Sequence, residues 1–222
     1  FDMLHSMRQF DDLTYVHSVN VALIASILGQ WLKFSEKDIR ILTISGLLHD
    51  IGKIMIPNEI LTKPGKLTVA EYNIMKQHVN FGYEKVKNQN IDIRIKEACL
   101  LHHEKCDGTG YPFGLKSDHI PAVAKIIAIA DVYDAMTSAR VYRGALCPFE
   151  VIDTMYKDAF TKFEPEYILP FLKNVASSYI NNDVRLSDGR IGKVVLINEN
   201  ALSLPIVQCE DEFIDLSKTR GL

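Results

Sequence analysis

One histidine–aspartate pair in this sequence stands where a helix should be most apolar. His49 and Asp50 follow directly after an apolar stripe at helical spacing, made of Ile41, Ile44, Leu47 and Leu48. A carboxylate at the inner end of such a helix costs free energy unless it is paired or binds a metal ion. For this pair alone, a buried hydrogen bond between the two side chains is the simpler explanation.

The same combination recurs along the chain, on helices that we expect at about 13–32, from 68 onward, at 91–104 and at 120–138. The polar groups on their apolar faces are His17, His78, His102, His103 and Asp131. On the helix that begins at 68, Ile74 and Phe81 share the inward face with His78. His103 can join its neighbour at one site only if their helix ends there, because adjacent helical residues point about 100° apart. One inward histidine is more often a core residue, but the recurrence favours a shared site.

Collected together, the inward groups have the composition of a metal centre: His17, His49, Asp50, His78, His102, His103 and Asp131. Imidazoles and carboxylates suit iron, manganese, nickel or zinc. The absence of cysteine from the set argues against a structural zinc site. Seven ligands are too many for one ion and suit two ions that share a bridging carboxylate. Such a pair can activate a hydroxide and hold both the attacking and the leaving oxygen of a phosphoryl transfer.

Basic residues and a turn-rich loop lie close to these groups in the sequence. Lys53, one turn beyond His49, could neutralise a phosphate oxygen or steady a nucleophilic water. Arg140 and Arg143 suit phosphate, although a solvated helix end explains them equally well. The loop at 107–112 is either a lid or substrate shelf, or simply a turn that ends a helix.

The pattern of the whole chain predicts a mainly α protein, a helical bundle with a small C-terminal antiparallel β appendage. Helix starts are indicated at Ser35 and at Thr68, which has Glu71 three residues on as a capping box. Helical periodicity continues to about residue 179, and short strand-like runs then follow, with a hairpin signal at Asp188-Gly189. We therefore expect a linker or helix tail over 1–10, a helical domain that carries the site over 11–180, and a small β subdomain over 181–222.

Composition narrows the class of protein and of partner. The chain has 222 residues and a net charge of −3, so no basic field favours a nucleic acid polymer. The longest apolar run, Val21 to Leu28, is too short to cross a membrane. Four cysteines without CxxC spacing are typical of free thiols, and we expect a cytoplasmic protein. Because the chain begins at Phe1, we expect it to be part of a longer one.

The motifs resemble the HD-GYP branch of the HD-superfamily metal-dependent phosphodiesterases. The resemblance covers about 11–163, includes the linking segments 60–68 and 129–138, and rests on three motifs: His49-Asp50-Ile51-Gly52-Lys53, His102-His103-Glu104 and Gly110-Tyr111-Pro112. It implies an HD-superfamily helical bundle that hydrolyses the bacterial second messenger cyclic di-GMP to linear pGpG and then GMP. Some members of the family act instead on a cyclic GMP-AMP dinucleotide.

The resemblance also implies roles for individual residues. Asp50 would bridge two divalent transition metal ions, iron or manganese. His17, His49 and Asp131 would complete one metal site, and His78, His102 and His103 the other. Substrate contacts would come from Lys53, Gly110, Tyr111, Arg140 and Arg143. It further implies an upstream sensor or receiver domain and is compatible with a homodimer.

Two rival functions stay open at this point. One is a catalytically weak signalling module that binds a cyclic dinucleotide, which is disfavoured because all seven ligand positions are filled. The other is an HD-type nucleotidase, which the Gly110-Tyr111-Pro112 loop disfavours. Some relatives carry a glutamate for a third metal where this chain has Leu13, one turn before His17. We therefore expect two metal ions rather than three.

Overall fold

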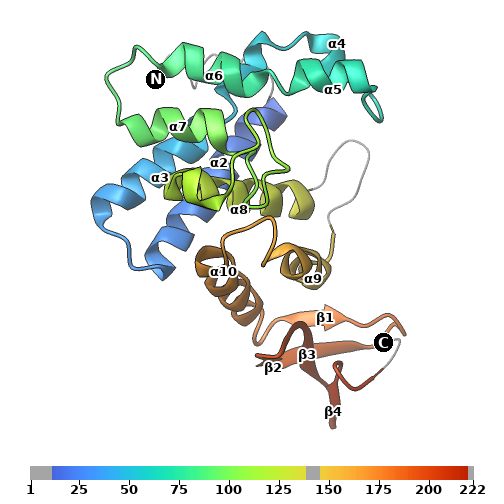
Figure 1. Ribbon diagram of the computed structural model, residues 1–222. Coiled ribbons are helices and arrows are strands. Elements are labelled where there is room, and N and C mark those ends of the chain that lie inside the picture. Colours follow the sequence, from blue (N-terminus) through green and yellow to red (C-terminus); the bar gives the residue numbers. More distant parts are fainter. Residues whose placement is uncertain (1–11, 139–145, 220–222) are drawn as a thin grey trace.

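The computed structural model describes residues 12–138 and 146–219 and confirms the predicted fold class, with helices first and a sheet last (Figure 1). The helices that build the site are α2 (Asp12–Trp31), α3 (Glu36–Leu48), α5 (Val69–Met75), α6 (His78–Val86), α7 (Ile93–Leu101) and α8 (Ala122–Thr137). Shorter elements between them are η1 (Ile51–Met55), α4 (Asn58–Leu61) and η2 (Ser117–His119).

The first two described helices form an antiparallel pair that carries the start of the site. Ser35 caps α3 by accepting a hydrogen bond from the backbone N–H of Asp38, as the sequence predicts. Val21 and Leu28 of α2 and Leu42 of α3 are fully buried in the common core. Ile44 is an exception to the predicted stripe, because its side chain is 40% exposed. By length and composition α2 could cross a bilayer, but here its apolar face packs in the core.

The segment after residue 68 differs from the single helix that we predicted. It breaks at Lys76 and Gln77 into α5 and α6, and the backbone N–H of Gln77 bonds to the carbonyl of Ile74, three residues back. Ile74 and Phe81, predicted to share an inward face with His78, are 42% and 36% exposed. His78 is buried because it is the first residue of α6, where the chain turns toward η1.

A close approach between η1 and α6 explains one glycine of the first motif. A Cβ atom on Gly52 would collide with the carbonyl oxygen of His78 and the backbone nitrogen of Gly82. The close approach depends on Gly52 and not on Gly82, because a Cβ on Gly82 would meet nothing closer than 3.4 Å.

The remaining elements form the lower part of the molecule in Figure 1. Two helices, α9 (Pro148–Asp158) and α10 (Pro165–Ser178), pack beside α8 and precede the sheet. The strands are β1 (Asp183–Arg185), β2 (Ile191–Asn198), β3 (Ala201–Cys209) and β4 (Glu212–Asp215), antiparallel in the order β1-β2-β3-β4. Gly189, at a φ of 93°, lies in the predicted turn between β1 and β2.

The sheet and the helices share one apolar core. Val194 and Val207 of the sheet are fully buried in the same cluster as Ile152 of α9 and Phe171 and Leu172 of α10. This packing anchors the appendage to the end of the bundle away from α5 and α6 (Figure 1). The division at residue 180 stays a prediction, since a shared core does not by itself separate two folding units. Residues 1–10 lie outside the described part of the chain.

Candidate metal centre

Asp50 lies at the middle of the site, between the end of α3 and the start of η1, and its side chain is almost completely buried. Each of its two carboxylate oxygens faces a different pair of histidines. Oδ2 lies 3.3 Å from Nε2 of His49 and 3.7 Å from Nε2 of His17. Oδ1 lies 3.3 Å from Nε2 of His78 and 4.0 Å from Nε2 of His102. The carboxylate therefore stands between two groups of imidazoles.

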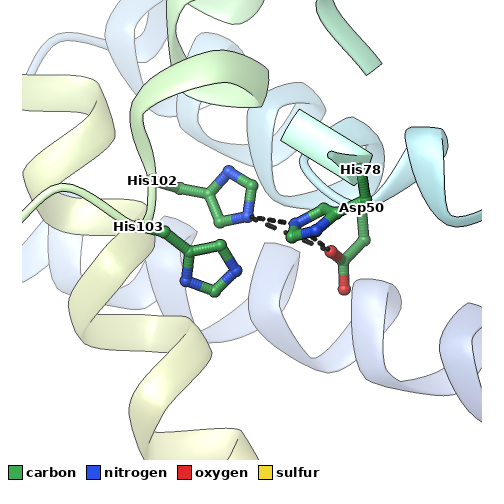
Figure 2. A group of neighbouring side chains, drawn as sticks. All are labelled: Asp50, His78, His102 and His103. Atoms are coloured by element: carbon green, nitrogen blue, oxygen red, sulfur yellow. Dashed lines mark hydrogen bonds and ion pairs between the residues drawn. The ribbon is translucent and has the colours of Figure 1, made fainter. Parts of the chain in front are cut away.

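Two overlapping groups of possible ligands share this carboxylate. One group is Asp50, His78, His102 and His103, and Figure 2 shows these side chains facing one another. The other is His17, His49 and Asp50. Within each group, one ligand atom from every residue lies within 4.8 Å of the others. His103 reaches the first group because α7 ends at Leu101, which is the condition the sequence set.

The histidines are oriented by hydrogen bonds on the side of the ring that faces away from Asp50. Nδ1 of His49 donates to the carbonyl of Gly46 (2.8 Å), and Nδ1 of His78 donates to that of Met75 (2.8 Å). Nδ1 of His102 donates in the same way to Ala98, at 3.0 Å. A proton fixed on Nδ1 leaves an Nε2 lone pair directed into the site, as metal-binding histidines require. There Nε2 of His78 and Nε2 of His102 lie 3.3 Å apart.

Two buried polar atoms in the site have no hydrogen-bond partner among the described residues, Nε2 of His49 and Oδ1 of Asp50. An unsatisfied buried acceptor costs about 1–3 kcal/mol, so each calls for an explanation. Both atoms are electron-pair donors, and they belong to different groups of ligands, Nε2 of His49 to one and Oδ1 of Asp50, facing His78, to the other. A divalent metal ion in each group would satisfy them, and the site therefore fits a metal centre of histidine and aspartate ligands.

His17 is held between two carboxylates of α8. Its Nε2 lies 3.0 Å from Oδ1 of Asp131, and its Nδ1 lies 2.6 Å from Oδ2 of Asp134. Burial alone would lower the pKa of His17, but the hydrogen bonds to Asp131 and Asp134 outweigh it and raise that pKa to about 9. The two carboxylates of α8 therefore favour the protonated form of His17 at pH 7.

The other groups are held in the protonation states that a metal requires. Burial lowers the pKa of His78 and of His102, and it lowers that of His103 to about 3, so these imidazoles are neutral at pH 7. Burial would raise the pKa of Asp50, but the charges of Lys53 and His49 hold it well below its usual value. Nζ of Lys53 lies 2.5 Å from Oδ2 of Asp50.

The loop after α7 brings Tyr111 over the centre. Its ring stacks on that of His103, with centroids 4.7 Å apart and planes at 27°. Gly110 must be glycine, because a Cβ there would collide with the backbone of residues 103–105. Glu104, buried, accepts hydrogen bonds from the backbone N–H groups of 113 (2.7 Å), 114 (3.1 Å) and 115 (2.8 Å). This carboxylate fixes the far end of the loop.

The structure brings together the seven residues that we predicted as ligands, with Lys53, Gly110 and Tyr111 beside them. Their individual roles stay predictions. Arg140 and Arg143 lie outside the described residues. Of the two other histidines, His119 is exposed in η2 and belongs to neither ligand group, whereas His5 is not described.

Two residues of the site were missed or undervalued at the level of sequence. From the sequence, Asp134 is expected to supply at most a neighbouring hydrogen bond or a weak outer ligand. It accepts the bond from His17 and two more, from Asn20 (2.9 Å) and Ser138 (2.9 Å), which hold it in place beside His17. Glu104 was assigned no role of its own from the sequence. The feature that could have identified it is its position directly after two inward histidines. The structure shows that this charged residue is buried.

Comparison with known proteins places this geometry in a family context. A sequence model of the family described as HD domain matches residues 6–167. A cyclic di-GMP phosphodiesterase of Pseudomonas aeruginosa is 36% identical over 203 residues, which is 91% of this chain and 49% of that protein. A 3′3′-cGAMP-specific phosphodiesterase of Vibrio cholerae is 36% identical over 158 residues, 70% of this chain and 30% of the relative. The chain thus spans about half the length of its curated relatives, or less.

A solved structure shows the same fold. The HD domain of the L. monocytogenes phosphodiesterase PgpH, solved with cyclic di-AMP, superposes with a TM-score of 0.61 over 80% of this chain and 95% of its own. The two sequences are 18% identical, so this likeness concerns the fold alone. It agrees with the helical bundle described above.

Proposed function

Because the chain belongs to the HD domain family and is homologous to HD-GYP phosphodiesterases, we propose that it hydrolyses the second messenger cyclic di-GMP. The observation that carries the proposal is the placement of Asp50. Its two oxygens face two separate groups of histidines, each through the Nε2 atoms of the rings. This is the arrangement that a carboxylate bridging two metal ions needs.

The centre would hold two divalent transition metal ions, iron or manganese, as suits imidazole and carboxylate ligands. His17, His49 and Asp131 would bind one ion, His78, His102 and His103 the other, and Asp50 both. When bound, the ions supply a hydroxide at neutral pH and stabilise the charge that develops on the phosphate. Leu13 offers no lone pair beside His17, which supports two ions rather than three.

Residues of the chain itself would orient the substrate around this centre. Lys53 holds Asp50 in the ionised form, and its ammonium group could also meet a phosphate oxygen. Gly110 lets the loop close over the centre, and Tyr111 forms an aromatic wall beside His103. Arg140 and Arg143 would add charge-assisted hydrogen bonds to phosphate. We expect rapid cleavage of the first phosphodiester to pGpG and slower release of GMP.

Cyclic GMP-AMP is the second candidate substrate. The specific reason is the relative in Vibrio cholerae, which is named for 3′3′-cGAMP and is as identical to this chain as the cyclic di-GMP relative. The two nucleotides differ in one purine, whereas the metal centre would contact the phosphate that they have in common. A non-catalytic binding module is less well supported, because every predicted ligand position is filled and directed inward.

The relatives' greater length supports an upstream sensor or receiver domain in the whole protein. A cytoplasmic location suits a substrate that is an intracellular messenger, and a homodimer is compatible with the family. These three points belong to the proposal and depend on the function being correct.

The direct test is anaerobic purification, loading with iron or manganese, and incubation with cyclic di-GMP and with 3′3′-cGAMP, followed by separation of the products. We expect pGpG from the first substrate and loss of both metals and turnover in Asp50→Ala. His119→Gln is the matched control, since that histidine is exposed and lies apart from the ligand groups. A metal-loaded protein that cleaves neither nucleotide would contradict the proposed function.

A further inference from the structure

Tyr72 of α5 and Lys76, directly after the end of that helix, extend the wall of the centre toward solvent. Tyr72 and Lys76 lie one turn apart, and Nζ of Lys76 is 5.3 Å from the ring centroid of Tyr72. The same ammonium group is 6.0 Å from the ring centroid of Tyr111, which comes from a loop distant in sequence. Lys76 thus links α5 to the aromatic ring that covers the centre.

These side chains continue directly from the candidate ligands. Tyr111 stacks on His103 at 4.7 Å and meets His78 edge to face at 6.4 Å. Lys76 lies two residues before His78, where the chain turns from α5 into α6. The order from the centre outward is therefore histidine, Tyr111, Lys76 and Tyr72. A ligand larger than one phosphate would reach this row of side chains.

The charge of Lys76 is available to a ligand. Within the described part of the chain, no carboxylate oxygen lies within 4.0 Å of its ammonium group, whereas Lys53 pairs with Asp50 and Lys63 with Glu71. Tyr72 is 48% exposed, so part of its ring is free for contact. An exposed aromatic ring beside an unpaired cation suits a nucleotide, since every base can stack on such a ring and phosphate attracts the cation.

We propose that Tyr72 and Lys76, with Tyr111, form a subsite for the part of a cyclic dinucleotide that lies outside the metal centre. A cyclic dinucleotide has two phosphodiesters and two purines, and the centre can engage only one phosphodiester at a time. The second phosphodiester meets Lys76 and a purine stacks on Tyr72. This inference rests on the proposed function and adds residues that select a dinucleotide over a simple phosphodiester.

The alternative is a purely structural role, in which the contact of Lys76 with Tyr72 one turn away only stabilises the end of α5. Such a contact would affect cleavage of all substrates equally. The contact of Lys76 with Tyr111 across the mouth of the centre favours the subsite, and a comparison of two substrates separates the two roles.

The experiment uses the metal-loaded chain with two substrates, cyclic di-GMP and bis(p-nitrophenyl) phosphate, which has one phosphodiester and no purine. The measured quantity is the ratio of kcat/KM for the dinucleotide to kcat/KM for the small diester. We expect Tyr72→Ala and Lys76→Met each to lower this ratio about tenfold, through KM for the dinucleotide. Tyr72→Phe and Lys76→Arg should restore most of it, because they keep the ring and the charge.

Matched controls are Tyr156→Ala, an exposed tyrosine of α9, and Lys85→Met, an exposed lysine of α6, and both should keep the wild-type ratio. An unchanged ratio in the Tyr72 and Lys76 variants would overturn the subsite alone. A wild-type chain that cleaves the small diester but no cyclic dinucleotide would overturn the proposed function, and the subsite with it. Equal losses on both substrates would assign the pair a structural role.

Discussion

The orientation of His17 depends on Asp134, which accepts its Nδ1 proton at 2.6 Å on the side away from Asp50. Partners of this kind typically change metal affinity about 10–100-fold when they are replaced. We expect Asp134→Asn to weaken one metal site by about that factor and leave the other intact. Titration of the apo protein with manganese, followed by electron paramagnetic resonance, measures this. Equal weakening of both sites would show that Asp134 acts on the fold instead.

Glu104 makes a second prediction at the scale of single residues. Its carboxylate accepts three backbone N–H groups from residues 113–115, and the amide of Gln can accept fewer. In Glu104→Gln we expect at least one of these three amides to lose its acceptor and to exchange hydrogen at least about tenfold faster, since a bond of about 1.5–3 kcal/mol held it.

The control for this variant is Glu84→Gln, an exposed glutamate of α6 in a surface ion pair with Lys87. Surface pairs of this kind contribute little to stability. Amide exchange at 113–115 should match the wild type in the control. Unaltered exchange in Glu104→Gln would mean that the loop is held by Tyr111 and Gly110 rather than by Glu104.

Residue types were predictable from the sequence, but their geometry was not. Histidine and aspartate at apolar helical positions indicate a site, because burial without a partner is costly. The sequence does not show which ring nitrogen faces Asp50. That choice depends on backbone carbonyls such as those of Gly46 and Met75. Because every residue has a carbonyl, the sequence does not mark the ones that accept these bonds.

Among the elements, η1 and α6 meet at Gly52, and this contact sets the position of His78. A Cβ at that position would overlap the carbonyl oxygen of His78, so the backbone must move. We expect Gly52→Ala to cost about 1–3 kcal/mol, which overpacking of a tight contact typically costs. For a domain of this size that corresponds to a fall in Tm of about 2–12 °C.

Gly82→Ala is the matched variant from the other side of the same contact. The nearest atom to an added Cβ would be 3.4 Å away, and alanine favours a helix over glycine. Its Tm should be equal to or higher than that of the wild type, measured by circular dichroism with both variants in parallel. If both variants behaved alike, the close approach would not be the reason for Gly52.

Helix starts were easier to predict than helix breaks. Ser35 and the capping box of Thr68 and Glu71 are local signals and lie where the sequence indicated. The break at Lys76 and Gln77 has no proline or glycine to mark it. It follows from the packing of α6 against η1, which is a tertiary contact, and this is why Ile74 and Phe81 were wrongly placed inside.

At the scale of the whole molecule, the candidate centre and the sheet lie toward opposite ends of the bundle. The end with α5, α6 and the loop after α7 holds the candidate centre, and the other end holds the sheet (Figure 1). The change from helical to alternating periodicity predicted the sheet and its antiparallel order. Its packing with α9 and α10 in one core could not be predicted. Apolar residues such as Val194 and Val207 indicate that this face of the sheet is buried, but not which helices bury it.

The central claim is that the carboxylate of Asp50 joins two metal ions. The most direct measurement is anomalous diffraction at the metal absorption edge from crystals loaded anaerobically with iron or manganese. We expect two full-occupancy peaks, one beside His17 and His49 and the other beside His78 and His102, each within bonding distance of one oxygen of Asp50. A single peak, a third peak beside His17, or two peaks without Asp50 as a shared ligand would contradict the account.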